Sequence, residues 1–318
     1  MRRPIVFMYS GQGAQYFQMG KELFENNAVF HENLERCARV VDPLIGASLI
    51  AEIYREKKSV PFNSTRFTHP ANVALAYCLT QVLASEGVRP DVLLGYSLGE
   101  YIAAIVAGAV SLEDALANVT RQALVLEEQT VPGGMLAVLG PTSLIKSRPD
   151  LFGSTTLACH NFDNHFVVTG YPQDLKRIEQ ALSDDEVSNQ ILPITHGFHS
   201  AIIEPAQQSL IKLMQGLFSD TTLPTWSAMT AKRVDQFNPE HMWNVIRQPV
   251  RFFDVIKQVE AEYGPTYVDV GPAGTLTTFT KYALGAEVGK RAHMTINQFG
   301  RDIKSMDTLI KTLRAAGY

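Results

Sequence analysis

The chain has 318 residues, of which 46% are hydrophobic and 19% are charged, and its formal net charge is −4. This size permits one large domain or two smaller ones with a buried core. The slightly acidic charge argues against a broad basic surface for nucleic acid, and no apolar run reaches the roughly 18 residues needed to span a bilayer. Three widely spaced cysteines form no metal-ligand pattern and indicate reduced thiols in a cytoplasmic protein: Cys37, Cys78 and Cys159.

The N-terminal residues 1–10 have a basic start but no long apolar region, and are typical of a first strand. A glycine-rich turn follows at Gly11–Gln15, before a helical stretch. A strand, a glycine-rich turn and a helix together resemble a phosphate-binding loop. The third glycine of the dinucleotide fold and a Gly-Lys-Ser/Thr ending are both absent, so nucleotide binding is disfavoured.

Helices are predicted over about 25–56 and over Ala71–Glu86, separated by a polar, turn-rich stretch from Ser59 to Pro70. The apolar run after Pro90 is typical of a buried strand.

The next motif carries the clearest chemical signal. Gly95–Gly99 reads Gly-Tyr-Ser-Leu-Gly, between an apolar strand and a helix that continues to Gly108. This is the Gly-x-Ser-x-Gly pattern of a nucleophile elbow, in which a tight strand-to-helix turn presents Ser97 outward. Glycines at both ends let strand, turn and helix approach closely. A plain glycine-serine turn in an α/β domain is the alternative interpretation.

The middle of the chain changes character after Pro132–Gly134. Before it, Ser111 opens a capping box and a helix that runs to about Gln129. After it the pattern is strand, helix, strand, strand, helix, strand, at Met135–Gly140, Ser143–Arg148, Thr155–His160, Phe166–Thr169, Pro172–Ser183 and Asn189–Thr195. This βαββαβ order predicts a ferredoxin-like subdomain over 132–198, inserted in a larger α/β domain made of 1–131 and 199–318.

Helical sequence resumes over Ser200–Phe218, and Trp226–Met229 and Tyr267–Val270 read as late strands of the large sheet.

A nucleophilic serine needs a base, and eight histidines are available. Three of them lie in polar or amphipathic stretches, where a solvated side chain is expected: His31, His241 and His293. Two others, His160 and His165, lie in the inserted subdomain. His196 and His199 lie at the junction between the subdomain and the large domain, where a base can face a cleft.

Five motifs occur in the order seen in malonyl-CoA:acyl carrier protein transacylases and in the acyltransferase domains of polyketide synthases. They are Gly11–Gln15, Thr68–Ala71, Gly95–Glu100, His196–Ser200 and Asp269–Pro272. The resemblance covers essentially the whole chain. It implies an α/β-hydrolase-like large domain with an inserted ferredoxin-like small subdomain, which agrees with the pattern of strands and helices described above.

The resemblance also implies residue roles. Ser97 matches the nucleophile and His199 its base, in a ping-pong mechanism through an acyl-enzyme. The backbone N–H groups of Gln12 and Leu98 match the oxyanion hole. The family uses no acidic third residue, and a backbone carbonyl near the predicted loop Trp243–Pro249 orients the histidine. Two other hydrolase families fit less well. Lipases of Ser-His-Asp order need a catalytic acid, which no motif of this sequence indicates, and patatin-like Ser-Asp hydrolases need a late Asp-Gly pair, where this sequence has Gly271-Pro272.

One departure from the family bears on the substrate. Malonyl-specific members carry an arginine that grips the malonyl carboxylate; the matching position, 25 residues after Ser97, is Gln122. A neutral glutamine offers no charged bidentate fork. Four further residues are expected to bind substrate. At two of them the chain departs from the common family residue: His69 stands in place of glutamine, and Tyr96 in place of histidine. The other two, His196 and Phe198, belong to the histidine motif.

Members with this change resemble the discrete acyl hydrolases of trans-acyltransferase polyketide pathways, which remove acetyl or other short acyl groups from carrier proteins. We therefore expect a proofreading hydrolase whose partners are acyl carrier protein domains of a polyketide synthase. A weak malonyl transferase and a transferase for neutral acyl groups are the alternatives. The resemblance implies a monomer with no cofactor or metal of its own, since the acyl group travels on phosphopantetheine or coenzyme A.

Overall fold

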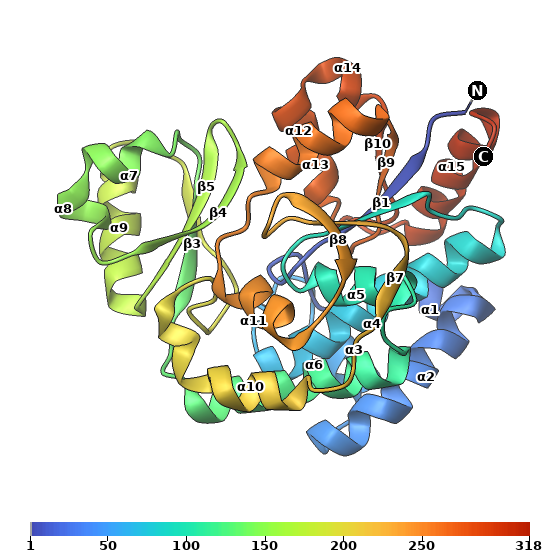
Figure 1. Cartoon of the computed structure of the whole chain (residues 1–318), viewed down its shortest axis with the longest axis horizontal. Coiled ribbons are helices and arrows are strands. Elements are labelled where there is room, and N and C mark those ends of the chain that lie inside the picture. Colours follow the sequence, from blue (N-terminus) through green and yellow to red (C-terminus); the bar gives the residue numbers. More distant parts are fainter. Residues whose placement is uncertain (1) are drawn as a thin grey trace.

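A computed structural model describes residues 2–318, and Met1 lies outside the described part. The main sheet is built from β1 (Ile5–Tyr9), β2 (Val92–Gly95), β7 (Asp220–Ser227), β8 (Lys232–Gln236), β9 (Thr266–Asp269) and β10 (Ala292–Met294). Its order is β10-β9-β1-β2-β7-β8, and only β7 and β8 pair antiparallel (Figure 1). Every residue of β1 and β2 is buried, as expected for parallel strands covered on both faces.

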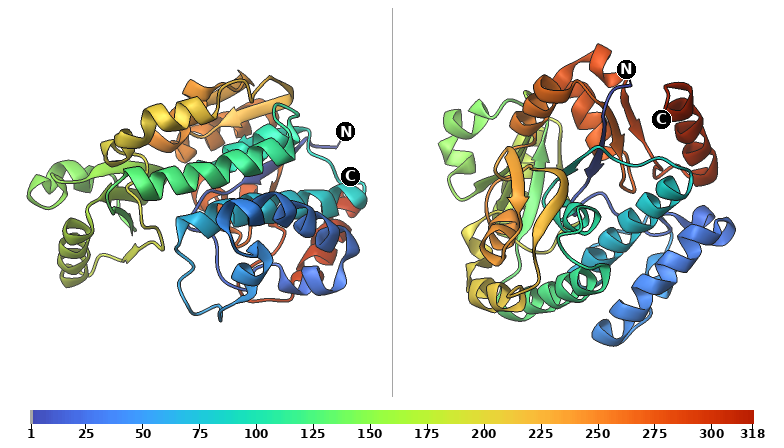
Figure 2. Two further views of the ribbon diagram at one scale, coloured as in Figure 1. Left: turned by 90° about the horizontal axis from the view of Figure 1, so that it is seen from below. Right: turned by 45° about the vertical axis from the view of Figure 1, so that its right-hand side comes forward.

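Helices flank this sheet on both sides. In the first half of the chain they are α1 (Lys21–Asn26), α2 (Ala28–Ile45), α3 (Leu49–Tyr54), α4 (Thr65–Ser85), α5 (Gly99–Val106) and α6 (Leu112–Gln129). In the second half they are the 3-10 helix η1 (Ala201–Ala206), α10 (Gln207–Leu213), α11 (Pro239–Arg247), α12 (Phe252–Tyr263), α13 (Thr275–Leu284), α14 (Ala286–Gly289) and α15 (Asp302–Ala315). Helices α2, α4 and α6 pack together, and Figure 2 shows them on the flank opposite to α12 and α13.

A second sheet forms a smaller unit, seen on the left of Figure 1. Its elements are β3 (Gly134–Val138), β4 (Thr156–Phe162), β5 (His165–Gly170) and β6 (Asn189–Ile191), with α7 (Ser143–Ser147), α8 (Pro149–Phe152) and α9 (Pro172–Asp184). Its strands pair antiparallel in the order β4-β5-β3-β6 around a separate apolar core. The predicted α/β class, a large parallel sheet with a βαββαβ insertion, is confirmed.

The two sheets are joined through the segment that follows α11. The N–H of His160 donates to the carbonyl of Val250 at 2.9 Å, and the N–H of Val250 donates to Ala158 at 2.8 Å. These bonds add Val250 to the edge of β4 as a short parallel bridge. The chain between α11 and this bridge is therefore held where the large domain meets the small one.

Three local predictions were wrong. Helix α4 begins at Thr65 and runs through Pro70, because most side chains of its first turns are buried and their packing outweighs their polar composition. The predicted loop at Trp243–Pro249 is mostly helical, since Asn238 caps α11 by accepting a hydrogen bond from the N–H of His241 at 2.8 Å. The helix predicted over Ser200–Phe218 is divided into η1 and α10.

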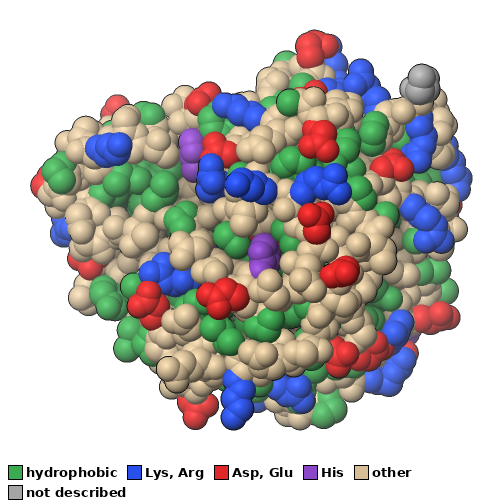
Figure 3. All heavy atoms as spheres, in the orientation of Figure 1, with side chains coloured by type: hydrophobic (Ala, Val, Ile, Leu, Met, Phe, Trp, Pro, Cys, Tyr) green, Lys and Arg blue, Asp and Glu red, His purple; other side chains and the backbone are tan. Residues whose placement is uncertain are grey.

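The surface carries mixed charge. On the face shown in Figure 3, basic and acidic side chains are interspersed among hydrophobic and neutral ones. Within residues 2–318, no helix combines the length and the apolar character that crossing a membrane requires.

Close packing of α5 against β1 yields the first prediction. A Cβ placed on Gly99 would lie 2.0 Å from the carbonyl oxygen of Tyr9, so Gly99→Ala forces two backbones apart. We expect the free energy of unfolding to fall by about 3 kcal/mol, the upper part of the range for overpacking. Gly87→Ala is the control, because no atom lies within 4 Å and only its φ of +83° opposes the change, at a cost of about 1 kcal/mol. Equal losses in urea unfolding would contradict this account.

Candidate active site

Ser97 occupies the turn between β2 and α5. Its φ is +52°, in the left-handed region that non-glycine residues rarely adopt. The turn is tight: a Cβ on Gly95 would lie 2.6 Å from the Cα of Glu100, the second residue of α5. Packing of the helix against the strand thus holds a strained serine at the start of α5. This is the geometry of a nucleophile elbow.

His199 is the base that the fold brings to this serine. Its Nε2 lies 3.0 Å from Ser97 Oγ, and its Nδ1 lies 2.7 Å from the carbonyl oxygen of Gln248. Because a carbonyl only accepts hydrogen bonds, Nδ1 carries the proton and Nε2 presents its lone pair to the serine hydroxyl. Burial lowers the pKa of His199 to about 4, although the Gln248 contact opposes this shift, so the ring is neutral near pH 7.

The carbonyl that orients His199 comes from the residue directly after α11. Sequence reasoning placed it in this region without identifying the residue, and the structure assigns it to Gln248. The N–H of His199 also donates to the carbonyl of Ile246 at 2.8 Å. Two backbone groups at the end of α11 therefore fix both the ring and the main chain of His199, whose own φ is +61°.

Two residues of the cavity lining have backbone N–H groups that are free to donate. The N–H groups of Gln12 and Leu98 donate to no acceptor within residues 2–318, and both residues line the cavity beside Ser97. Leu98 also directly precedes α5, where the helix N-terminus favours negative charge. Together these groups are suited to accept an oxyanion formed from a carbonyl bound at Ser97.

The side chain of Gln12 is held from α4. Its Nε2 donates to Thr68 Oγ1 at 2.8 Å, and its Oε1 lies 3.1 Å from Nε2 of His69. Since Oε1 can only accept, His69 is the donor in this contact. Burial, with a smaller contribution from nearby His196, lowers the pKa of His69 to about 3, so the ring is neutral. His69 thus contributes to the cavity wall and also steadies the oxyanion-hole residue.

The cavity at Ser97 has a volume of about 180 Å³. That is room for about six water molecules, or for a short acyl group. Its wall is largely apolar, with side chains from both domains: Met135, Ala137, Val167, Leu192, Ile194, Phe198, Ile246, Leu276 and Phe279. No lysine, arginine, aspartate or glutamate is among the described residues that line it. The cavity is therefore neutral as well as small.

A polar chain crosses one wall of the cavity. The hydroxyl of Tyr96 donates to Asn161 Oδ1 at 3.0 Å, and Nδ2 of Asn161 donates to His165 Nδ1 at 3.0 Å. Sequence reasoning missed Asn161 and His165, because only the packing of the small domain against the large one brings them to the cavity at Ser97. Cys159 lines the same wall, and burial raises its pKa to about 12, so it stays a thiol and does not compete as a nucleophile.

Two predicted substrate-binding residues do not line the cavity. Gln122 is buried in α6, where its Oε1 lies 3.1 Å from the hydroxyl of Tyr101 and its Nε2 has no hydrogen-bond partner. His196 is stacked on Phe198 with ring centroids 5.9 Å apart, behind the wall. Both side chains are buried beside other residues of the protein, and their contact with substrate stays a prediction. The other predicted site residues do line the cavity: Gln12, His69, Tyr96, Ser97, Leu98, Phe198 and His199.

His241 also differs from its prediction. Its Nε2 lies 2.8 Å from a carboxylate oxygen of buried Glu100, so it is a paired side chain and not a solvated one. The partner was not recognisable from the sequence, because 141 positions separate the two residues. Among the described residues, no group of three or more His, Cys, Asp or Glu side chains is arranged to hold a metal ion.

Comparison with known proteins supports this picture. Residues 6–316 match the family model described as an acyl transferase domain. The chain is 35% identical to the polyketide biosynthesis acyltransferase homolog PksD of Bacillus subtilis (strain 168), covering 97% of this chain and 96% of that protein. It is 36% identical to the homolog BaeD of Bacillus velezensis, covering 95% and 94%. The solved acyl transferase domain of SpnD, in complex with a pentynylmalonyl group, superposes with a TM-score of 0.90 at 26% identity, over all of this chain and 77% of that one.

The buried neutral histidines make stability pH dependent. The folded protein keeps His69 unprotonated down to a pKa of about 3, whereas histidine in the unfolded chain titrates at 6.5. Below pH 6.5 the unfolded chain binds a proton at this histidine that the folded chain does not, so the free energy of unfolding falls as pH falls. His69→Gln should reduce this slope by up to about 1.4 kcal/mol per pH unit over roughly pH 4–6.

Urea unfolding at several pH values measures the slope. A slope that is the same in His69→Gln and in the unmodified protein would show that His69 is not a buried neutral ring.

Proposed function

Because the chain belongs to the acyl transferase domain family, we propose that it is an acyl hydrolase that acts through a Ser-His acyl-enzyme. Its substrates are acetyl or other short neutral acyl groups, held as thioesters on acyl carrier protein domains of a polyketide synthase. The observation that carries the proposal is the neutral cavity of about 180 Å³ around Ser97. The named function of the relatives PksD and BaeD supports the setting of polyketide biosynthesis.

The contacts at Ser97 support the first half of the proposed reaction. Nε2 of His199 takes the proton of Ser97 Oγ, which attacks the thioester carbonyl. The resulting oxyanion accepts hydrogen bonds from the N–H groups of Gln12 and Leu98, each worth about 3–4 kcal/mol in the transition state. Collapse of the intermediate breaks the C–S bond, and the imidazolium returns its proton to the departing thiolate. The products are the acyl ester of Ser97 and the free pantetheine thiol.

The second half regenerates the enzyme. Neutral His199 removes a proton from water, the hydroxide oxygen attacks the ester, and Ser97 Oγ leaves with a proton from the imidazolium. The carboxylic acid is released. Throughout, the carbonyl of Gln248 accepts the Nδ1–H bond, so the ring keeps one tautomer and one orientation.

Selectivity follows from the charge of the wall. A malonyl carboxylate in this cavity would meet no lysine or arginine among the described lining residues. An unpaired buried charge costs about 3–5 kcal/mol, which corresponds to about 10²–10⁴-fold in binding. In family members specific for malonyl groups an arginine occupies the position of Gln122, and here that position holds a neutral amide directed at Tyr101. A neutral acyl group avoids this cost.

The alternative is acyl transfer. The names of PksD and BaeD describe acyltransferase homologs, which favours a malonyl-CoA or acyl-CoA:acyl carrier protein acyltransferase. Both activities share the acyl-enzyme at Ser97 and differ in whether water or a second thiol attacks it. Comparing the amount of free acid with the amount of acylated second carrier protein separates them.

Removing the nucleophile tests the mechanism. Ser97→Ala should abolish acylation of the protein and lower thioester hydrolysis by about 10³-fold or more, since the group that forms the ester is gone. Intact-protein mass spectrometry after mixing with acetyl-pantetheine measures acylation. Ser147→Ala, in an exposed position on α7, should react like the unmodified protein. Acylation that persists in Ser97→Ala would refute the assignment.

Comparing two thioesters tests the selectivity. We expect the kcat/KM for hydrolysis of an acetyl-carrier protein to exceed that of the malonyl-carrier protein by about 10²-fold, because the cavity lacks a cation for the carboxylate. Release of the carrier-protein thiol, followed with a chromogenic reagent, measures both rates. Equal rates, or a preference for malonyl, would favour the transferase.

A further inference from the structure

The position of His199 depends on α11. Both backbone groups that hold this histidine, the carbonyls of Ile246 and Gln248, lie at the C-terminal end of that helix, 2.8 Å and 2.7 Å from the nitrogens they bind. A displacement of α11 would therefore move the base away from the serine. The contacts that fix α11 are part of what sets the 3.0 Å distance between Ser97 Oγ and His199 Nε2.

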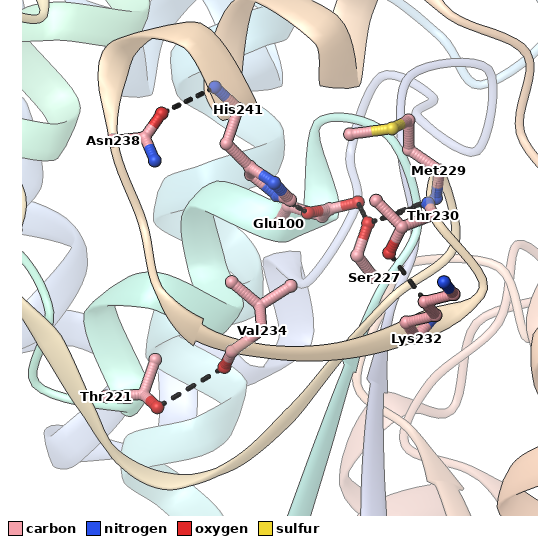
Figure 4. Close-up of polar contacts among 9 residues, drawn as sticks. All are labelled: Glu100, Thr221, Ser227, Met229, Thr230, Lys232, Val234, Asn238 and His241. Atoms are coloured by element: carbon pink, nitrogen blue, oxygen red, sulfur yellow. Dashed lines mark hydrogen bonds and ion pairs between the residues drawn. The ribbon is translucent and has the colours of Figure 1, made fainter.

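The other end of α11 is tied to a buried carboxylate. His241, in the first turn of the helix, points at Glu100 and places Nε2 2.8 Å from Oε2 (Figure 4). The side chain of Glu100 is 1% exposed and that of His241 is 12% exposed. The second carboxylate oxygen of Glu100 accepts a hydrogen bond from Ser227 Oγ at 2.6 Å. Both carboxylate oxygens thus have a donor inside the protein.

Ser227 joins this cluster to the main sheet. It is the last residue of β7, and its hydroxyl oxygen accepts hydrogen bonds from the N–H groups of Met229 and Thr230 at 3.2 Å and 3.3 Å (Figure 4). The carboxylate therefore connects α5, the end of a strand and α11. These three elements approach one another beneath the serine turn.

Glu100 also belongs to the serine turn. It follows Ser97 by three residues, and its N–H donates to the carbonyl of Ser97 at 2.8 Å. The contacts form a closed path: Ser97 to Glu100 along the turn, Glu100 to His241, along α11 to Gln248, then to His199 and back to Ser97. The bond between Glu100 and His241 joins positions that lie 141 residues apart in the chain.

We propose that Glu100 and His241 are positioning residues: their hydrogen bond fixes α11 against the serine turn and thereby holds His199 at bonding distance from Ser97. Without the donor, a buried carboxylate oxygen loses its partner, and α11 shifts or water enters to satisfy it. A misplacement of about 1 Å in a reacting pair lowers the rate by about 10²-fold. The inference rests on the acyl-enzyme chemistry of the proposed function.

Two substitutions that differ by one methylene test the proposal. His241→Gln places an amide N–H near the position of Nε2, so it can still donate to Glu100. His241→Asn carries the same amide one carbon shorter, near the position of Nδ1, and cannot reach the carboxylate. Glu240→Gln, at the exposed neighbouring position in α11, is the control that should behave like the unmodified protein.

The measured quantities are the single-turnover rate of Ser97 acylation by acetyl-pantetheine, the KM for that thioester, and the thermal midpoint. We expect acylation by His241→Asn to be about 10- to 100-fold slower at nearly unchanged KM, because the cavity that binds the acyl group is intact. His241→Gln should recover most of the rate. Glu100→Leu should slow acylation too, since it removes the oxygen that accepts from His241.

Acylation that is equally fast in His241→Asn and in the unmodified protein would overturn the proposal. So would an equal loss in His241→Asn and His241→Gln, or a loss in His241→Asn that appears in KM alone, because each points to general destabilisation or to substrate binding. If His241→Asn does not fold, the comparison of His241→Gln with Glu100→Leu gives the decision, since only the second removes the acceptor for His241. Failure of the proposed function is distinguishable, because then the unmodified protein itself would not be acylated at Ser97.

Discussion

The hydrogen bond between Nδ1 of His199 and the carbonyl of Gln248 is the interaction on which the site depends. It fixes the tautomer that leaves a lone pair on Nε2, and only that tautomer can take a proton from Ser97. The partner is a carbonyl dipole and not a carboxylate, so the imidazolium formed during the reaction is stabilised by a partial charge. This arrangement needs no acidic third residue, but it does need a backbone that cannot move. The segment around Gln248 meets that need, because α11 precedes it and the bridge of Val250 to β4 follows it.

Burial is the second constraint, and it acts on charge throughout the site. The histidines near Ser97 are neutral because they are desolvated, and the described wall of the cavity carries no formal charge. A site of this kind favours an uncharged acyl group and keeps His199 ready as a base at neutral pH. The same burial makes the protein less stable in acid, since the rings must be protonated when the chain unfolds. The proposed selectivity, the proposed role of His199 as a base and the expected pH dependence thus have one physical origin.

Local patterns in the sequence predicted much of this architecture. The elbow around Ser97, the capping box at Ser111 and the βαββαβ order each depend on neighbouring residues, and each appears in the structure. The resemblance of ordered motifs added His199. What the sequence did not reveal depends on long-range packing: the helical start of α4 at Thr65, the identity of the carbonyl at Gln248 and the pairing of His241 with Glu100.

Gln122 shows the limit of reasoning from position. Its place in the chain identified a missing charge, and the neutral cavity agrees with that reading, yet the side chain itself does not line the cavity and faces Tyr101. The charge of the wall could be predicted, whereas the contacts of the amide could not, because they depend on how α5 and α6 pack. The proposed selectivity therefore rests on the whole wall and not on one residue.

A competition experiment tests the central claim most directly. The protein is mixed with equal amounts of acetyl- and malonyl-pantetheine, quenched in acid within the first turnover, and the peptide that contains Ser97 is analysed by mass spectrometry. The account predicts that Ser97 carries the acetyl ester almost exclusively and that free acetate accumulates with time. A malonyl ester on Ser97 as the main adduct would contradict it.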